Sequence, residues 1–160
     1  MILGHAALAV LGKRTVFRVV PLPILMIATY APDLIDKTGM LFLGTSSKNL
    51  GHALITFVGI SVILAVALAP IRSNKLNTLW VSTVVLWIMH LFLDLTDKSI
   101  LLWPLIGPFP STDTYDLSEG FIEFYSGHGN NLVLTFDITC IIVAFIVLIW
   151  PRRPKQSNAL

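Results

Sequence analysis

Long apolar runs alternate with short polar segments along this chain. Residues 53–71 carry no charge, and residues 76–93 carry none if His90 is neutral. Residues 131–150 form a third run, interrupted by Asp137 alone. Because a transmembrane helix needs about 20 residues at a rise of about 1.5 Å each, every one of these runs predicts a membrane-spanning helix.

Two shorter apolar segments lie nearer the N-terminus. Residues 19–32 become long enough to span a membrane when they are extended to 16–36, whereas residues 2–12 are too short to cross alone and predict a half-helix packed inside the bundle. We therefore predict an all-α fold, a polytopic transmembrane helical bundle with four to five membrane segments. It forms one domain over residues 1–150, followed by a cytoplasmic tail over residues 151–160.

The connection from Asp97 to Asn130 is the one long loop in this pattern. Its residues 101–105 read Leu-Leu-Trp-Pro-Leu, which is too apolar for free solution and predicts a segment lying along the membrane surface. Residues 112–125 mix aromatic and aliphatic side chains with acids, as an interfacial helix does. The loop is therefore expected to form an interfacial lid on the outer side.

Composition supports a membrane protein and excludes other classes. Hydrophobic residues make up 55% of the chain and charged residues 12%, with a mean hydropathy of +0.80. Soluble domains carry about 25% charged residues, so much of this exterior must face lipid. Basic residues form no clustered face for nucleic acid. The single cysteine, Cys140, excludes an internal disulfide and a cysteine-based metal cluster.

Charges of opposite sign separate to the two sides of the predicted spans. Eight basic residues fall on one side: Lys13, Arg14, Arg18, Arg72, Lys75, Arg152, Arg153 and Lys155. Three fall on the other side: Lys37, Lys48 and Lys98. By the positive-inside rule the first side is cytoplasmic. The acids gather on or near the outer side: Asp33, Asp36, Asp94, Asp97, Asp113, Asp116, Glu119 and Glu123.

Histidines and carboxylates at the outer helix ends form a candidate metal site. His90 and Asp94 are four residues apart on one predicted helix, so they lie on the same face. Asp33 and Asp36 lie one turn apart, and His52 begins the next span. Two imidazoles and two carboxylates around one position suit a divalent cation, Zn²⁺ first and Mn²⁺ second.

Burial cost is the reason to expect an ion here. Ionisable groups at membrane depth cost about 2.5–3.5 kcal/mol each, so several persist together only if they pair or bind something. Each residue alone also has a plainer interpretation: Asp33 and Asp36 can mark a helix end, and Asp137 can pair structurally. His5 lies near the cytoplasmic charges at Lys13, so either the site is sunk into the bundle or His5 is not a ligand.

The order of these motifs resembles the YdjM-like family of bacterial inner-membrane proteins, described as membrane-bound metal-dependent hydrolases. The resemblance covers residues 1–108 and rests on five motifs: Gly4-His5, Pro-Asp-Leu-Ile-Asp at 32–36, Gly51-His52, His-Leu-Phe-Leu-Asp at 90–94, and Leu-Trp-Pro-Leu at 102–105. Many members carry a histidine where this chain has Lys37.

That family is distantly similar to zinc-dependent phospholipase C and P1 nuclease, helical phosphoesterases with a zinc cluster. The resemblance implies two metal sites, of which the more complete one is formed by Asp33, His52, His90 and Asp94. It also implies that His5 and Asp94 form a second metal site, so that one or two ions bind. A later His-x-x-x-Glu pair of the soluble enzymes is missing, because Leu132 stands four residues after His128.

The leading interpretation is a membrane-bound metal-dependent hydrolase of the bacterial inner membrane. It would be a phosphoesterase acting on a lipid or lipid-linked substrate at the extracytoplasmic face, with Asp36 or Asp97 as general base or second-metal ligand. Two alternatives come from other classes: an ion or small-solute transporter with these residues as a relay, and a non-catalytic scaffold with a structural metal. A transport pathway should also continue to the other membrane face, whereas the acids gather at one.

Overall fold

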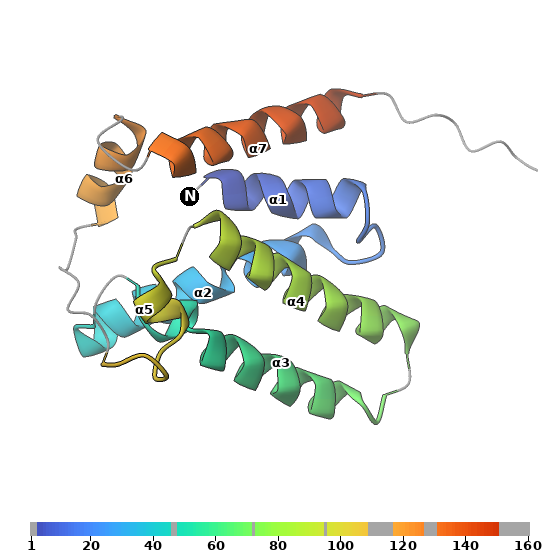
Figure 1. Ribbon diagram of the computed structural model, residues 1–160. Coiled ribbons are helices and arrows are strands. Elements are labelled where there is room, and N and C mark those ends of the chain that lie inside the picture. Colours follow the sequence, from blue (N-terminus) through green and yellow to red (C-terminus); the bar gives the residue numbers. More distant parts are fainter. Residues whose placement is uncertain are drawn as a thin grey trace, which may run out of the picture.

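Seven α-helices and one short 3-10 helix build the fold of the described residues, which contain no strand (Figure 1). The computed structural model describes residues 3–45, 48–71, 73–94, 96–108, 117–126 and 131–150. The elements are α1 (Leu3–Arg14), α2 (Leu22–Leu43), the 3-10 helix η1 (Leu50–His52), α3 (Leu54–Leu68), α4 (Asn74–Leu93), α5 (Lys98–Leu101), α6 (Leu117–Tyr125) and α7 (Asn131–Ile149). The predicted tail, 151–160, and His128 lie outside the described residues.

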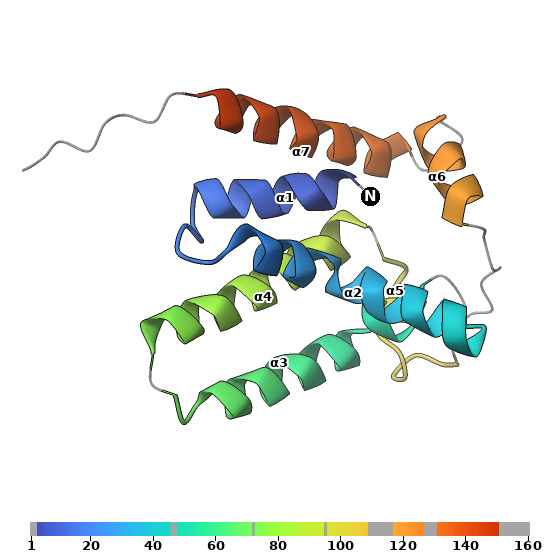
Figure 2. The ribbon, with the colours of Figure 1, turned by 180° about the vertical axis from the view of Figure 1, so that it is seen from behind.

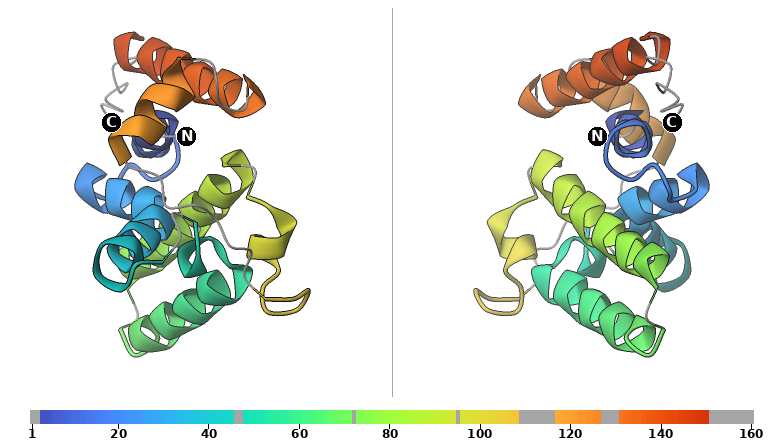
Figure 3. Two further views of the ribbon diagram at one scale, coloured as in Figure 1. Left: turned by 90° about the vertical axis from the view of Figure 1, so that its left-hand side faces the viewer. Right: turned by 90° about the vertical axis from the view of Figure 1, so that its right-hand side faces the viewer.

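The long helices stack in the order α7, α1, the pair α2 and α4, and then α3 (Figures 1 and 3). One end of this stack holds the start of α1, η1, the end of α4, and α5 and α6. The opposite end holds the end of α1, the α3–α4 connection and the end of α7, as the view from behind also shows (Figure 2).

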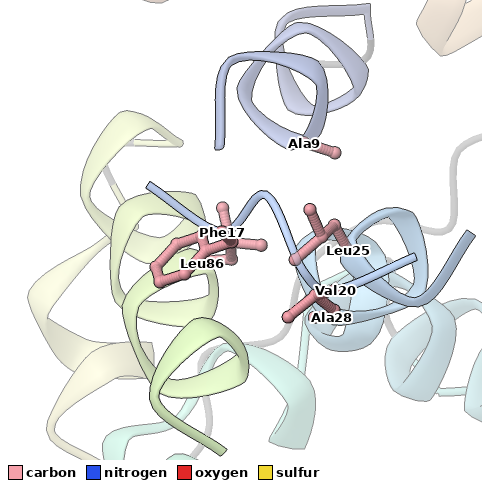
Figure 4. Close-up of a cluster of buried hydrophobic side chains, with 6 residues drawn as sticks. All are labelled: Ala9, Phe17, Val20, Leu25, Ala28 and Leu86. Atoms are coloured by element: carbon pink, nitrogen blue, oxygen red, sulfur yellow. The ribbon is translucent and has the colours of Figure 1, made fainter. Parts of the chain in front are cut away.

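A buried apolar cluster fixes α1 against α2 and α4 (Figure 4). Its members come from these three helices and from the α1–α2 connection: Ala9, Phe17, Val20, Leu25, Ala28 and Leu86. The Nζ of Lys13 donates to the carbonyl oxygens of Arg18 at 2.6 Å and Val20 at 2.9 Å, which closes the connection. Because α1 is held on both sides, its first turn has a defined place at the end of the bundle.

The outer faces of α3, α4 and α7 are apolar and largely exposed. α4 and α7 are long and apolar enough to cross a membrane, and 33% and 17% of their most apolar windows are buried. A core helix of a soluble protein would be mostly buried instead. Exposed side chains on α3 and α7 include Ile55, Val62, Ile63, Val66, Ile142, Phe145 and Ile149. Exposed apolar faces of this kind occur on surfaces that meet lipid or another protein.

The structure shortens one predicted span. The prediction was a span over residues 53–71, but α3 has 15 residues and ends at Leu68. Pro70 explains the end, because proline has no N–H to donate to the carbonyl oxygen four residues earlier. At about 1.5 Å per residue, α3 is about 22 Å long, shorter than a hydrocarbon core of about 30 Å.

The structure also corrects the end of the span around residues 16–36. α2 begins at Leu22 and continues through the buried Pro32 to Leu43, where Gly44 closes it with a left-handed φ of 63°. Pro32 removes one backbone hydrogen bond and leaves the rest of the helix intact, as neighbouring groups commonly allow in membrane helices. Asp33 and Asp36 therefore lie in the middle of a helix rather than at its end.

Candidate metal centre

Four side chains from three elements converge at the end of the bundle where α1 begins. Asp33 projects from the middle of α2, His52 from η1, His90 from the last turn of α4, and Asp94 follows directly after α4. Each offers one ligand atom, and these four atoms all lie within 4.8 Å of one another. This group could hold a metal ion, and it contains the four residues that the sequence brought together on the outer side.

The spacing between the donor atoms is close to that of a tetrahedral site. His52 Nε2 lies 3.2 Å from His90 Nε2, 3.4 Å from Asp94 Oδ2 and 3.8 Å from Asp33 Oδ1. Donors at about 2.0–2.1 Å from a tetrahedral Zn²⁺ are about 3.3 Å from each other. The distances from His52 are close to this value, whereas the four ligand atoms as a group lie within 4.8 Å of one another, so coordination of one ion would need the side chains to move inward.

Asp36 positions His52 from behind. Its Oδ2 lies 2.7 Å from His52 Nδ1 and accepts from Asn49 N–H at 2.6 Å, while its Oδ1 accepts from Gly51 N–H at 2.6 Å. A histidine that donates through Nδ1 presents the lone pair of Nε2 to the cluster, the state that a metal needs. These contacts use both oxygens of Asp36 and position His52, and the role of general base or second-metal ligand that the sequence analysis named for Asp36 stays a prediction.

Replacing Asp36 by asparagine tests the positioning of His52. An amide has one acceptor oxygen and an NH₂ group that would face the donors of Asn49 or Gly51, so His52 loses its orientation. We expect Asp36→Asn to weaken Zn²⁺ binding by about 10–100-fold, the usual cost of losing such a partner. Competition with a chromophoric chelator measures it. Unchanged affinity would show that His52 does not need Asp36.

His5 lies against the cluster with unpaired nitrogens. It is fully buried, and neither ring nitrogen has a hydrogen-bond partner in the described part of the chain. Its Nδ1 is 3.9 Å from Asp33 Oδ2, its Nε2 is 3.8 Å from Asp94 Oδ1, and its ring stacks on His90 at 3.8 Å between centroids. Of the two alternatives for His5, the structure supports a site sunk into the bundle.

Lys48 is a member of the site that sequence reasoning missed. Its Nζ lies 2.8 Å from Asp94 Oδ2, and its side chain is 37% exposed while that of Asp94 is 5% exposed. Burial alone raises the pKa of Asp94, but His52 and Lys48 outweigh burial and hold it well below its usual value. Burial likewise lowers the pKa of His52, but the carboxylates of Asp36 and Asp94 outweigh it and raise that pKa.

Asp97 and Asp137 have other contacts. Asp97 is exposed and accepts from Ser99 N–H at 2.7 Å, so it caps the start of α5. These contacts give Asp97 a structural role, and its predicted role as general base or second-metal ligand stays a prediction. Asp137 on α7 is fully buried and accepts from Gly4 N–H at 2.7 Å and from the hydroxyl of Tyr125 at 2.7 Å. It thus ties the first turn of α1, next to His5, to α6 and α7.

Comparison of the chain with protein-family models, with curated proteins and with solved structures gave no match. The class of the protein is therefore assigned from the structure of the described residues alone. It is an all-helical protein with two helices able to cross a membrane and with a histidine–aspartate group that could hold a metal ion.

Proposed function

We propose that this chain is a membrane-bound metal-dependent hydrolase, a phosphoesterase acting on a lipid or lipid-linked substrate at the extracytoplasmic face. The observation that carries the proposal is the convergence of Asp33, His52, His90 and Asp94 on one point at a single end of the bundle. Two of these side chains are fully buried histidines. Buried groups of this kind are arranged at functional sites, where they bind ions or reactants.

The chemistry of the residues fits a divalent cation. Three carboxylates, those of Asp33, Asp36 and Asp94, lie in or beside this group, and the ammonium of Lys48 contacts only that of Asp94. A divalent cation would balance the remaining negative charge. The imidazole and carboxylate set suits Zn²⁺ first and Mn²⁺ second. His5, with both nitrogens unpaired and a carboxylate within 4 Å of each, supports a second ion beside the first.

A bound ion would polarise a phosphoryl oxygen and make a water molecule acidic enough to react at neutral pH. The protein residues supply placement. Asp36 holds the orientation of His52, and the buried His90 and His5 exclude water from the inner side. Asp33 is 26% exposed and lies at the open side, where substrate enters.

The same proposal covers the membrane arrangement. We propose that α1, α2 and α3 cross or enter the bilayer with α4 and α7, giving a multi-pass protein with four to five membrane segments. The basic end of α1, with Lys13 and Arg14, lies at the opposite end from the candidate site. By the positive-inside rule that basic end is cytoplasmic, and the site faces outward in the bacterial inner membrane.

Exposed apolar residues near the site support a lipid substrate. Leu105 and Ile106, in the turn after α5, are 83% and 52% exposed, and Phe121 and Ile122 on α6 are 42% and 67% exposed. α5 and α6 both lie at the end of the bundle that carries the site (Figure 1). These segments belong to the outer loop for which a lid is predicted, and they would let a lipid approach along the membrane surface.

Metal analysis and hydrolysis together test the proposal. The detergent-purified protein should carry about one or two Zn²⁺ per chain. It should hydrolyse bis(p-nitrophenyl) phosphate, lose this activity to a chelator and regain it with Zn²⁺. Metal without turnover would indicate the scaffold with a structural metal, and absence of metal would remove both the hydrolase and the scaffold interpretations.

A transporter is disfavoured by the position of the buried acids. Besides Asp36, Asp137 is the fully buried acid among the described residues, and it lies at the same end and is hydrogen-bonded.

A further inference from the structure

The ammonium of Lys48 occupies a carboxylate oxygen that a metal ligand must offer. Lys48 Nζ is 2.8 Å from Asp94 Oδ2, and the same oxygen is 3.4 Å from His52 Nε2. A divalent ion shared by His52 and Asp94 would lie about 2 Å from this oxygen. The ammonium and the ion would repel each other across this one oxygen, so binding of the ion would weaken the contact that Lys48 makes with it.

Lys48 also differs from the other members of the site in exposure. Its side chain is 37% exposed, whereas His5, His52 and His90 are fully buried. Lys48 directly precedes Asn49, whose backbone N–H donates to Asp36, so the backbone of Lys48 is held next to the site. A flexible four-carbon stem lets the ammonium move outward while the backbone stays in position.

We propose that Lys48 is a substrate-contacting residue that changes its anionic partner when the metal binds. In the metal-free protein its ammonium binds the carboxylate of Asp94. When a divalent cation binds that carboxylate, the ammonium binds a non-bridging oxygen of a phosphoester instead. This inference rests on the proposed function and makes it more specific. The site then selects substrates that carry negative charge beside the scissile bond over neutral esters. An ammonium is a general phosphate ligand, and beside a metal ion it gains strength from partial burial.

The exchange predicts effects of opposite sign on two ligands. In Lys48→Met, which keeps the apolar stem and removes the charge, Zn²⁺ should bind about tenfold more tightly because its competitor is gone. Inorganic phosphate should bind the zinc-loaded variant about tenfold more weakly because its cation is gone. A role in folding alone would weaken both. Lys48→Gln provides a second variant, and Lys98→Met, at the exposed start of α5, is the matched control.

Isothermal titration with Zn²⁺, and with phosphate on the zinc-loaded protein, measures both affinities without turnover. In kinetics, the KM for bis(p-nitrophenyl) phosphate should rise about tenfold in Lys48→Met with a smaller change in kcat, and hydrolysis of the neutral p-nitrophenyl acetate should not change. If the unmodified protein binds Zn²⁺ but the Lys48 variants match it in both affinities, the exchange is wrong and the metal site stands. If the unmodified protein binds no Zn²⁺, the proposed function fails, and this inference with it.

Discussion

Replacing Asp94 by alanine is expected to abolish metal binding and hydrolysis. Asp94 is the carboxylate on which the site converges: Oδ2 lies 3.4 Å from His52 Nε2, and Oδ1 lies 3.8 Å from His5 Nε2. Its loss removes a ligand from the first ion and the link to the second. A lost outer partner already costs about 10–100-fold in affinity, so a lost ligand should cost about a hundredfold or more.

Zinc competition and phosphodiester hydrolysis measure this loss, and Asp97→Ala is the matched control. Asp97 is three residues further along the chain, exposed, and engaged with Ser99. Its removal should lower stability slightly through the lost cap of α5 and leave zinc affinity unchanged. The assignment fails if Asp94→Ala binds Zn²⁺ like the unmodified protein. If Asp97→Ala keeps Zn²⁺ but loses hydrolysis, Asp97 has the catalytic role that sequence analysis gave it.

The long helices and the four-residue group could be predicted from the positions of apolar and ionisable residues along the chain. Long apolar runs predict α4 and α7 because a helix is the structure that satisfies its own backbone in lipid. The resemblance in motif order singled out Asp33, His52, His90 and Asp94, and the alternation of spans alone brings these chain positions to one side together with Asp36 and His128. That reasoning needs only the order and number of crossings, and no side-chain contact.

Other parts of the site depend on contacts that sequence patterns do not carry. Lys48 lies in the polar segment between α2 and η1. In the sequence, a lysine of such a segment that contacts Asp94 cannot be told apart from one that is solvated. The roles of Asp36 and Asp137 come from backbone N–H groups of distant segments, at Gly51 and Gly4. Only the folded chain shows which donor each carboxylate meets. The continuation of α2 beyond Pro32 likewise depends on packing, and specifically on the Asp36 hydrogen bonds that hold its second half to η1.

Gly51 is the residue at which η1 packs closely against α2. A Cβ at this position would lie 2.1 Å from the backbone oxygen of Pro32 and 2.9 Å from Asp36 Oδ1. The first contact is with helix backbone, which cannot turn aside as a flexible side chain can. Alanine here must therefore push η1 away from α2, and the three hydrogen bonds of Asp36 act at the same place.

We expect Gly51→Ala to destabilise the protein by about 3 kcal/mol or more, the upper range for overpacking with loss of buried hydrogen bonds. Because His52 is the next residue, zinc affinity should fall together with the melting temperature in detergent. Gly59→Ala is the matched control, since Gly59 lies on the exposed face of α3 and its added Cβ meets nothing within 4 Å. That variant should keep its zinc affinity and gain about 0.5–1 kcal/mol from helix propensity. If Gly51→Ala instead binds Zn²⁺ normally, His52 is not a ligand held by this close contact, because a shift large enough to admit the methyl group would move its imidazole out of reach of Asp94.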